Sequence, residues 1–188
     1  ELCQVLGWLI GDGWLRYGDK NCRVGFTFGK SDDEVLNYLR PIINKMYGKD
    51  IKDVKRERNT KHLSYHSKYF VDFFRKLGVK NVDAQYKTVP ESIFTANKEA
   101  VIGFLQGLFT SDGTVNFREE NSTSYIRLCS KSKKLLQEVQ ILLLNLGITS
   151  NIYDRSREFR EGLFEYINKY GELVKYDSDG ILFELEII

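Results

Sequence analysis

The sequence predicts a mixed α+β fold built from two related halves. An apolar segment that ends in Asp-Gly occurs twice, 100 residues apart, and the stretches after the two copies come in the same order. Each copy precedes segments with strand periodicity and then one with helical periodicity. The 188 residues are 42% hydrophobic and include only two prolines, which supports a core and excludes collagen-like, low-complexity and disordered chains.

Each half of the repeat begins with an apolar helix and two strands. The predicted helices are Val5–Gly13 and Leu105–Gly113, with small residues at the third and seventh places. The second strand of each half ends in Lys-Ser; these strands and lysines are Arg23–Gly29 with Lys30, and Ser124–Ser130 with Lys131. The two lysines lie 101 residues apart, so the repeat holds in order and in spacing.

An amphipathic helix follows each Lys-Ser pair. In the first half, Ser31 and Glu34 match a capping box, and the apolar residues at helical spacing are Val35, Leu39, Ile42, Ile43 and Met46. Pro41 is expected to kink this helix or to end its regular bonding. The counterpart stops at Gly147 and has no acidic first turn, so we expect a weaker cap; its apolar residues are Leu135, Leu136, Val139, Leu142, Leu143 and Leu146.

Further strands complete the pattern. In the first half they are Ile51–Arg58 and Lys61–Ser67, followed by a helix over Lys68–Leu77 and a connection over Val79–Asn97. The matching strands of the second half are Ile148–Arg157 and Ile181–Ile188, and the Gly-, Glu- and Tyr-rich segment between them is an insertion or loop. We therefore expect domains at residues 1–97 and 98–188, each an αββαββα half, with the last helix of the second half absent. The first candidates for the aromatic core are Phe26, Phe28, Phe70 and Phe74.

Charge is unevenly distributed along the chain. The formal net charge is +2, but residues 1–98 contain 18 Lys+Arg and 12 Asp+Glu, a balance of +6. The remaining 90 residues contain 10 and 14, a balance of −4. A basic first half favours a polyanionic partner, although solvated surface charge also accounts for it.

The cysteines and apolar runs bear on the cell compartment. Cys3, Cys22 and Cys129 lack CxxC spacing, which argues against a disulfide framework or a zinc site and fits a reducing compartment, so we expect a cytoplasmic protein. No apolar run reaches the ~18 residues of a membrane span, and no signal peptide stands at the start. Because Met46 is the only methionine, we expect the chain to be a piece of a longer one.

The repeated helices point to a shared catalytic site. Gly7 and Gly11 lie on one helical face, as do Gly107 and Ser111, and small residues on one stripe allow two helix backbones to approach closely. If the helices pack through these stripes, the final aspartates of the two copies become neighbours at negative helix ends. Such a pair needs a cation, and Mg²⁺ prefers oxygen ligands of this kind. The arrangement suits phosphodiester hydrolysis, although each copy alone is also typical of ordinary helix packing.

The two copies resemble the LAGLIDADG motifs of homing endonucleases. Residues Thr88–Phe94, which lead into the second copy, resemble the intein-encoded (dodecapeptide) branch, and the resemblance covers about residues 5–188. It implies a monomer with no obligate protein partner and no membrane, whose motif helices meet at a pseudo-twofold interface. Four strands per half would form concave antiparallel sheets, a DNA-binding saddle over double-stranded DNA. Neither flank carries intein splicing residues, so we do not expect protein splicing.

The resemblance also implies roles for single residues. Asp12 and Asp112 match the metal-binding catalytic acids, one for each DNA strand, and the carbonyl groups of Gly11 and Ser111 match further metal ligands. The implied cofactor is Mg²⁺, with Mn²⁺ as a substitute.

Two lysines complete the implied active sites. Lys30 and Lys131 match the basic residue near each site, which stabilises phosphate charge or orients the attacking water. The copies depart from the family pattern at Trp8, Ile10 and Thr110, but the Asp-Gly is intact in both.

Basic and polar residues on the expected strands are candidates for DNA contacts. The candidates are Arg23, Thr27, Lys52, Lys55, Arg56, Arg58, Lys61, His62, His66, Arg127, Arg155 and Arg157. The densest group lies between residues 52 and 61, where a solubilising hairpin is the alternative. A zincin site at His62 and His66 is excluded because Leu63 stands where Glu is needed, and Gly25–Ser31 is one residue too short between its glycines for a P-loop.

The leading hypothesis is a Mg²⁺-dependent, site-specific endonuclease that cleaves both strands of a long asymmetric DNA site, each half covering ~10 bp. The main alternative is a catalytically inactive nucleic-acid-binding protein of the same fold, an RNA-splicing maturase or a DNA regulator. An interaction domain without nucleic acid is a third possibility.

Overall fold

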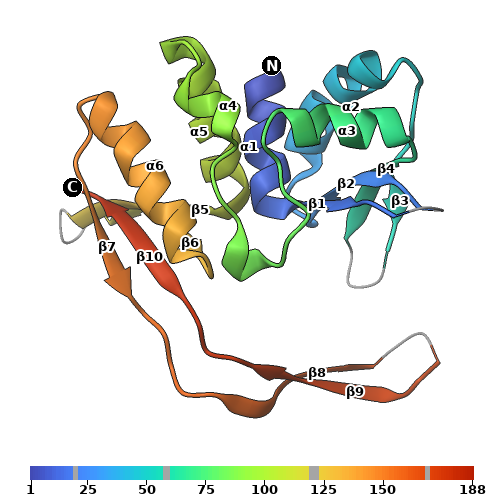
Figure 1. The fold of residues 1–188 in the computed structure, drawn as a ribbon. Coiled ribbons are helices and arrows are strands. Elements are labelled where there is room, and N and C mark those ends of the chain that lie inside the picture. Colours follow the sequence, from blue (N-terminus) through green and yellow to red (C-terminus); the bar gives the residue numbers. More distant parts are fainter. Residues whose placement is uncertain (19–20, 57–59, 119–122, 168–169) are drawn as a thin grey trace.

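The computed structural model describes residues 1–18, 21–56, 60–118, 123–167 and 170–188, which form two antiparallel four-stranded sheets covered by helices on one face. The helices lie above both sheets and leave the lower faces open (Figure 1). The predicted α+β class is confirmed. The first sheet and its helices are α1 (Leu2–Asp12), β1 (Gly13–Arg16), β2 (Arg23–Phe28), α2 (Asp33–Tyr47), β3 (Val54–Lys55), β4 (Lys61–Tyr65) and α3 (Lys68–Lys76).

A connection and a second set of elements follow. The connection contains a 3₁₀ turn, η2 (Ala84–Tyr86), and a short helix, α4 (Glu91–Phe94). The second set is α5 (Lys98–Asp112), β5 (Gly113–Arg118), β6 (Thr123–Ser130), α6 (Lys133–Asn145), β7 (Ser150–Asp154), β8 (Arg160–Ile167), β9 (Leu173–Ser178) and β10 (Phe183–Ile187).

Both large sheets have the same strand order. The first runs β1-β2-β4-β3 and the second β5-β6-β10-β7. If the β8–β9 pair is set aside, each order is first, second, fourth and third strand of its half. The predicted pseudo-twofold duplication is therefore confirmed, whereas the division between residues 97 and 98 stays a prediction.

The helix-facing side of each sheet forms the core. In the first sheet, Phe26, Phe28 and Leu63 are fully buried beneath α2 and α3. Phe74 of α3 is also fully buried and Phe70 is 7% exposed, so the predicted aromatic core is confirmed. In the second sheet, Leu128 of β6 and Leu185 of β10 are buried. They pack under the buried leucines of α6, which are Leu135, Leu136 and Leu142.

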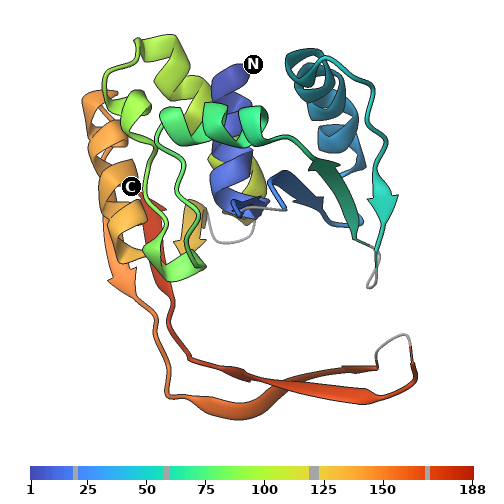
Figure 2. The same ribbon diagram turned by 45° about the vertical axis from the view of Figure 1, so that its right-hand side comes forward.

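Helices α1 and α5 pack against each other at the centre of the molecule (Figure 2). A Cβ atom added to Gly7 would overlap the carbonyl oxygen of Phe104, and one added to Gly107 would overlap that of Gln4. A Cβ on Gly11 would overlap the hydroxyl of Ser111. The predicted close approach through small residues is confirmed, because these positions have no room for a larger side chain.

Trp8, a departure from the family pattern, ties α1 to the first sheet. Its indole stacks on Phe28 at 5.2 Å between ring centroids, and its Nε1 donates to the carbonyl oxygen of Thr27 at 3.3 Å. The unusual residue therefore strengthens the junction between the motif helix and β2.

Two expectations about helix starts are wrong. The Ser31–Glu34 capping box does not form: Asp32 is the N-cap of α2 without a side-chain cap bond, because its carboxylate accepts from the Gly29 amide at 2.6 Å and from the Ser31 hydroxyl at 3.2 Å. The expected weaker cap of α6 is instead well made, since the fully buried Ser132 accepts from the Leu135 amide at 3.1 Å.

Other local expectations need smaller corrections. Helix α2 runs through Pro41 to Tyr47, and the kink expected at Pro41 stays a prediction. The strands are shorter than expected, at Val54–Lys55 for β3 and Ser150–Asp154 for β7. Glycine stops α6 as predicted, with Gly147 at φ +80°.

The segment expected to be an insertion or loop contains a two-stranded ribbon. Strands β8 and β9 pair antiparallel with each other and continue the line of β7 and β10 beyond the second sheet. The ribbon curves beneath the open faces of both sheets (Figures 1 and 2). Within the part of the chain that the structure describes, no helix has the length and apolar character needed to cross a membrane.

Replacing Gly7 with alanine is expected to destabilise the fold by about 1–3 kcal/mol, because the new Cβ meets backbone atoms of α5 that have no room to move. Gly103→Ala is the matched control on the same helix pair. Its Cβ would lie at an ordinary 3.5 Å from Cys3 Cβ, and alanine favours the helix by up to about 1 kcal/mol. Urea unfolding of both variants measures the difference; equal stability would contradict the close packing.

Candidate functional site

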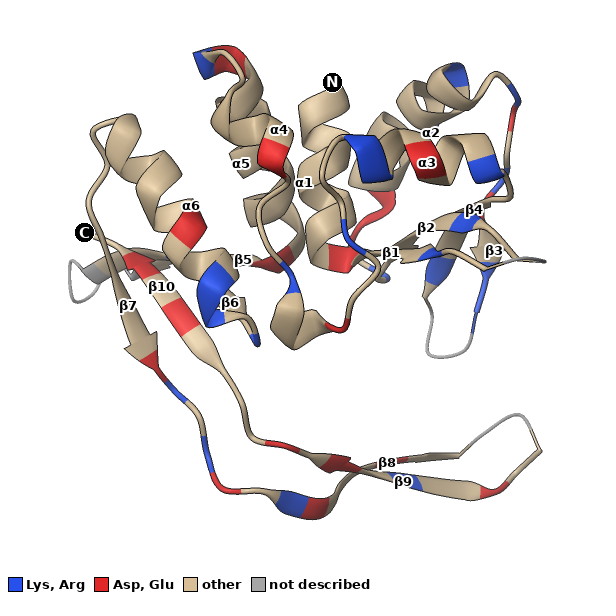
Figure 3. Ribbon diagram, in the orientation of Figure 1, with Lys and Arg blue, Asp and Glu red and all other residues tan. Residues whose placement is uncertain are grey.

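The packed helices bring Asp12 and Asp112 together. Each is the last residue of its helix, and the following glycine, Gly13 or Gly113, starts the first strand of a sheet. Acidic residues accordingly lie at the lower ends of α1 and α5 (Figure 3). Their closeness follows from the packing, since a Cβ added to Gly11 would lie 3.0 Å from Oδ2 of Asp112. The site is therefore built by the same contact that joins the two helices.

The protein disfavours the charged form of both carboxyls. Burial raises the pKa of Asp112 to about 6, with a further increase from Asp12 and an opposing effect of Lys87. Burial also raises the pKa of Asp12, which Lys87 lowers and Asp32 raises. Two desolvated carboxylates beside two negative helix ends are a configuration that calls for positive charge.

Lys87 supplies positive charge from the connection between the sheets. Its Nζ donates to the carbonyl oxygens of Ile10 and Gly11, both at 2.6 Å, and so caps the C-terminal end of α1. Burial lowers the pKa of Lys87, while Asp112 and Asp12 raise it. The positive charge of Lys87 therefore lowers the pKa of both Asp12 and Asp112 against the effect of their burial.

Helix α6 holds this part of the connection in place. The hydroxyl of Ser132 donates to the carbonyl oxygen of Lys87 at 2.7 Å. Two residues on, the Val89 amide donates to Oε2 of Glu138 at 2.8 Å. These two bonds fix the backbone on either side of Thr88, so the Lys87 side chain starts from a defined position.

The sequence interpretation missed Lys87. The lysine lies 76 residues from Gly11, and no local pattern predicts a contact over that separation. It stands directly before Thr88–Phe94, the segment that carries the resemblance to the intein-encoded branch. Two neighbouring carboxylates at helix ends favour a protein cation as well as a metal. The lysines of the connection are therefore the candidates that the sequence offers for this role.

The oxygen atoms at the two helix ends fit a hard divalent cation. Two carboxylates and nearby carbonyl groups are the ligand types that Mg²⁺ and Mn²⁺ accept, together with water and phosphate. Among the described residues, no group of three or more His, Cys, Asp or Glu side chains could hold a metal ion. Within the described ranges, Asp12 and Asp112 are the carboxylates that a metal held here would take as ligands, and the predicted ligation by Gly11 competes with Lys87 for the same carbonyl oxygen.

The two predicted lysines lie in different surroundings. Lys30 is exposed and lines a hollow of about 460 Å³ with other predicted DNA contacts; the lining residues are Lys30, Asp33, Lys55, Arg56, Thr60 and Lys61. Lys131 is bound to the carboxylate of Asp179, at 2.9 Å from both oxygens. Neither is among the groups that shift the pKa of Asp12 or Asp112. Their catalytic role stays a prediction.

The open face of the first sheet carries part of the predicted DNA contacts. Arg23, Thr27 and His62 alternate with buried core residues and therefore point away from the helices. Burial and Arg56 lower the pKa of His62, which places Arg56 beside it. His66 follows β4, with its Nε2 at 3.4 Å from the Ser64 hydroxyl.

Other members of the predicted set lie off this face. Lys61 pairs with Asp33 at 2.6 Å on the helix side of the sheet, and Lys55 is opposite it in register. Lys52 is exposed and lies in the segment between α2 and β3. Arg58 is outside the described residues. Arg157 is exposed, and its amide donates to the carbonyl oxygen of Gly180 at the start of the ribbon.

Asp112→Asn is expected to raise the free energy of unfolding at pH 7. The pKa of Asp112 is about 6 in the folded protein against an ordinary 3.8, so the folded state binds more protons than the unfolded chain between these values. Stability from the protonated carboxyl is present at low pH and is lost as the pH rises towards 6. The free energy of unfolding of Asp112→Asn should exceed that of the unchanged protein by a difference that grows between about pH 4 and pH 6 to about 1–3 kcal/mol.

Urea unfolding of both proteins in chelator, at closely spaced pH values, measures this difference. An advantage that does not change with pH would contradict the raised pKa.

Comparison with protein families and curated proteins gives consistent matches. Residues 99–181 match the family model described as LAGLIDADG-like domain. The chain is 39% identical over 182 residues to the ribonucleoside-diphosphate reductase NrdEB subunit alpha of Bacillus subtilis (strain 168), covering 86% of this chain and 16% of the reductase. It is 28% identical over 189 residues to a DNA polymerase of Thermococcus kodakarensis, covering 95% of this chain and 10% of the polymerase. The chain thus spans a sixth or less of these curated relatives.

Solved structures share the fold. I-DmoI in complex with DNA and Mn superposes with a TM-score of 0.65 at 20% identity, covering 99% of this chain and 88% of that chain. I-DmoI in complex with DNA and Ca gives 0.63, also at 20% identity, covering 99% and 81%. Other structures of I-DmoI, described as a homing endonuclease, match similarly. Residues 99–181 therefore match a LAGLIDADG-like domain, and the chain has the fold of the homing endonuclease I-DmoI.

Proposed function

We propose that this chain is a metal-dependent endonuclease that cuts both strands of a long asymmetric DNA site. The observation that carries the proposal is the pair of desolvated carboxyls, Asp12 and Asp112, held at two adjoining helix ends above the open faces of two sheets. I-DmoI has this fold, and its structures include complexes with target DNA in the presence of Mn or Mg. The two halves differ in charge and sequence, which favours an asymmetric site.

In this proposal each aspartate serves one DNA strand. Asp12 and Asp112 would hold the divalent cation, Mg²⁺ with Mn²⁺ as substitute, and carbonyl groups, water and phosphate are of the chemical type that would complete its ligands. A bound cation would polarise the scissile phosphate and lower the pKa of a water molecule. Lys87 keeps positive charge at the end of α1 and limits the repulsion between the two carboxylates and the phosphates.

Binding of DNA would use the open faces of both sheets. Strand residues that point away from the helices would meet base edges, and Lys30 and Arg56 beside the first sheet would meet phosphates. A duplex resting on the two sheets would run between them and the β8–β9 ribbon (Figure 2). The domains at residues 1–97 and 98–188 would each contact one half of the site.

We further infer that the chain belongs to the intein-encoded branch. A reductase subunit and a DNA polymerase have no common reaction, yet this chain matches 16% of one and 10% of the other. A segment that recurs inside unrelated proteins is better explained by insertion of a mobile element than by shared catalysis. The monomeric state rests on the duplication, since one chain holds both aspartates.

Asp12→Asn is expected to abolish cleavage of at least one strand and to leave DNA affinity within a few fold, because the change keeps the side-chain shape and removes a metal ligand. Nicked and linear products on a supercoiled plasmid carrying the selected site report the two strands separately. Asp83→Asn in the exposed connection is the matched control for the loss of one charge. Full cutting of both strands by Asp12→Asn would sink the proposal; DNA binding without cutting by the unchanged protein in Mg²⁺ would favour the inactive binding protein.

Lys87→Met is expected to slow cleavage by about 100-fold or more while DNA binding changes little, because it removes a fixed positive charge beside the reacting phosphate. Lys80→Met removes the same charge from an exposed position of the connection and should cut normally. Single-turnover rates at saturating Mg²⁺ measure both. If the Lys87→Met variant cuts at the unchanged rate, the ammonium group of Lys87 acts only as a cap of α1.

A further inference from the structure

Glu184 is a buried carboxylate on the open face of the second sheet. It lies on β10, an inner strand of the sheet, and the residue is only 9% exposed. Its neighbours along β10, Phe183 and Leu185, face the helices, so Glu184 points to the open side. A buried glutamate is normally paired with a positive charge. A carboxylate on the proposed DNA-binding face would also repel phosphates, so its presence there calls for an explanation.

Two arginines from the flanking strands converge on this carboxylate. Arg155, just after β7, places Nη2 at 3.0 Å and Nε at 3.2 Å from Oε1 of Glu184. Arg127, on β6, places Nη1 at 3.7 Å from Oε2. Arg127 also donates from Nε to Glu186, the next open-face residue of β10, at 2.8 Å. The cluster has two positive and two negative charges and is neutral as a whole.

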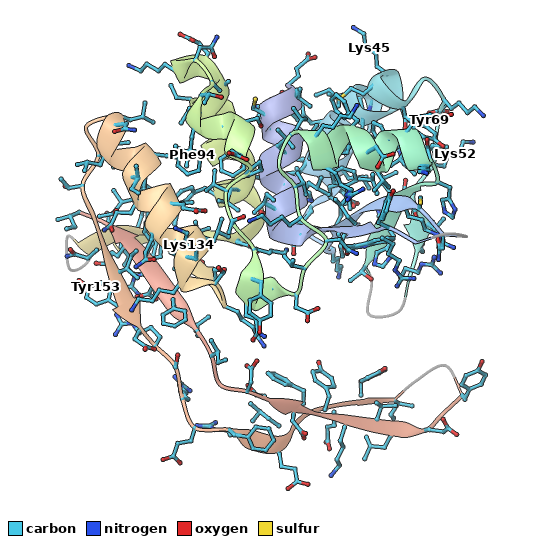
Figure 4. The ribbon with its side chains drawn as sticks, viewed as in Figure 1. Lys45, Lys52, Tyr69, Phe94, Lys134 and Tyr153 are labelled. Carbon is cyan, nitrogen blue, oxygen red and sulfur yellow. The ribbon has the colours of Figure 1, made fainter. Side chains whose placement is uncertain are left out.

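An aromatic ring supports each arginine from its own strand. The guanidinium carbon of Arg127 lies 3.7 Å from the centroid of the Tyr125 ring, and that of Arg155 lies 4.9 Å from the centroid of the Tyr153 ring. Figure 4 shows Tyr153 on β7 at the side of this sheet. Carboxylates and aromatic rings together leave each guanidinium little rotational freedom, so the arginines are held in fixed planes before any ligand arrives.

The cluster is also close to the candidate catalytic carboxyls. Cys129 is opposite Glu184 in register, and Gly113, which directly follows Asp112, is opposite the adjacent Leu128. The arginines therefore face the part of a bound duplex that lies near the scissile bonds on the side of the second sheet.

A neutral cluster of this kind suits base edges better than phosphates. It adds no net positive charge, and its carboxylates would repel a phosphate that came close. In the major groove, a guanidinium held in one plane can donate two hydrogen bonds to O6 and N7 of guanine. A fixed plane favours this paired contact, because the ordering of the side chain is already complete.

We propose that Arg127 and Arg155, oriented by Glu184, form a subsite that reads two guanines in the major groove of the half-site under the second sheet. The inference rests on the proposed function, since it concerns the same DNA. Glu184 acts here as a positioning residue, and the two arginines are the specificity-determining residues. The target site should therefore contain guanine at two positions of this half-site.

The test is a selection of binding sites from a randomised duplex library in Ca²⁺, followed by sequencing. Arg127→Lys and Arg155→Lys keep the charge but lose the paired contact, so each should reduce the preference for guanine at one position by about tenfold. Glu184→Gln keeps the size of the side chain and should weaken the preference at both positions together, with the other positions unchanged. Glu99→Gln, which removes one charge from the exposed first turn of α5 at the end away from Asp112, is the matched control and should change no position.

Unchanged base preferences in folded Arg127→Lys, Arg155→Lys and Glu184→Gln proteins would overturn the proposal and leave the cluster as a surface ion-pair network. Thermal unfolding confirms that each variant is folded, and the half-exposed Arg155 gives a variant with little risk to the core. Failure of the unchanged protein to bind any duplex would overturn the proposed function instead, and this inference with it.

Discussion

The contact between α1 and α5 is the constraint on which the rest of the structure depends. Gly7, Gly107 and Gly11 leave no room for a larger side chain, so the two helix backbones meet directly. This contact brings Asp12 and Asp112 together at the helix ends. Because each aspartate is followed by the first residue of a sheet, one interface sets the position of both the site and the open faces of the two sheets.

The same constraint has an electrostatic cost. Burial of the Asp112 carboxyl raises its pKa to about 6, and the neighbouring Asp12 adds a smaller increase. The protein offsets part of this cost with the ammonium group of Lys87, whose backbone is held by Ser132 of α6. Lys87 of the connection and helix α6 thus contribute to a site that lies at the ends of α1 and α5. A site of this kind gives up stability for a strong attraction to cations.

The sequence predicts the parts of this design that repeat. The two copies of an apolar segment with small residues in register predict the helix contact and the paired aspartates, and the resemblance to the LAGLIDADG motifs implies the two sheets. Lys87 was not predictable in the same way, because it is not repeated and its partners lie 76 and 77 residues away. The start of α2 was missed because Asp32 and Ser31 satisfy each other locally, an outcome that depends on side-chain geometry. The ribbon was missed because β8 and β9 lie within an insertion that has no counterpart in the first half.

The most direct test of the central claim is incubation of the chain with a randomised duplex library in Mg²⁺, with a chelator control, followed by sequencing of the cut ends. The account predicts recurrent cuts on both strands around one asymmetric sequence, present only with the metal. Cut ends without sequence preference, or identical ends in the chelator, would contradict the claim that Asp12 and Asp112 form a metal-dependent site serving a sequence-reading surface.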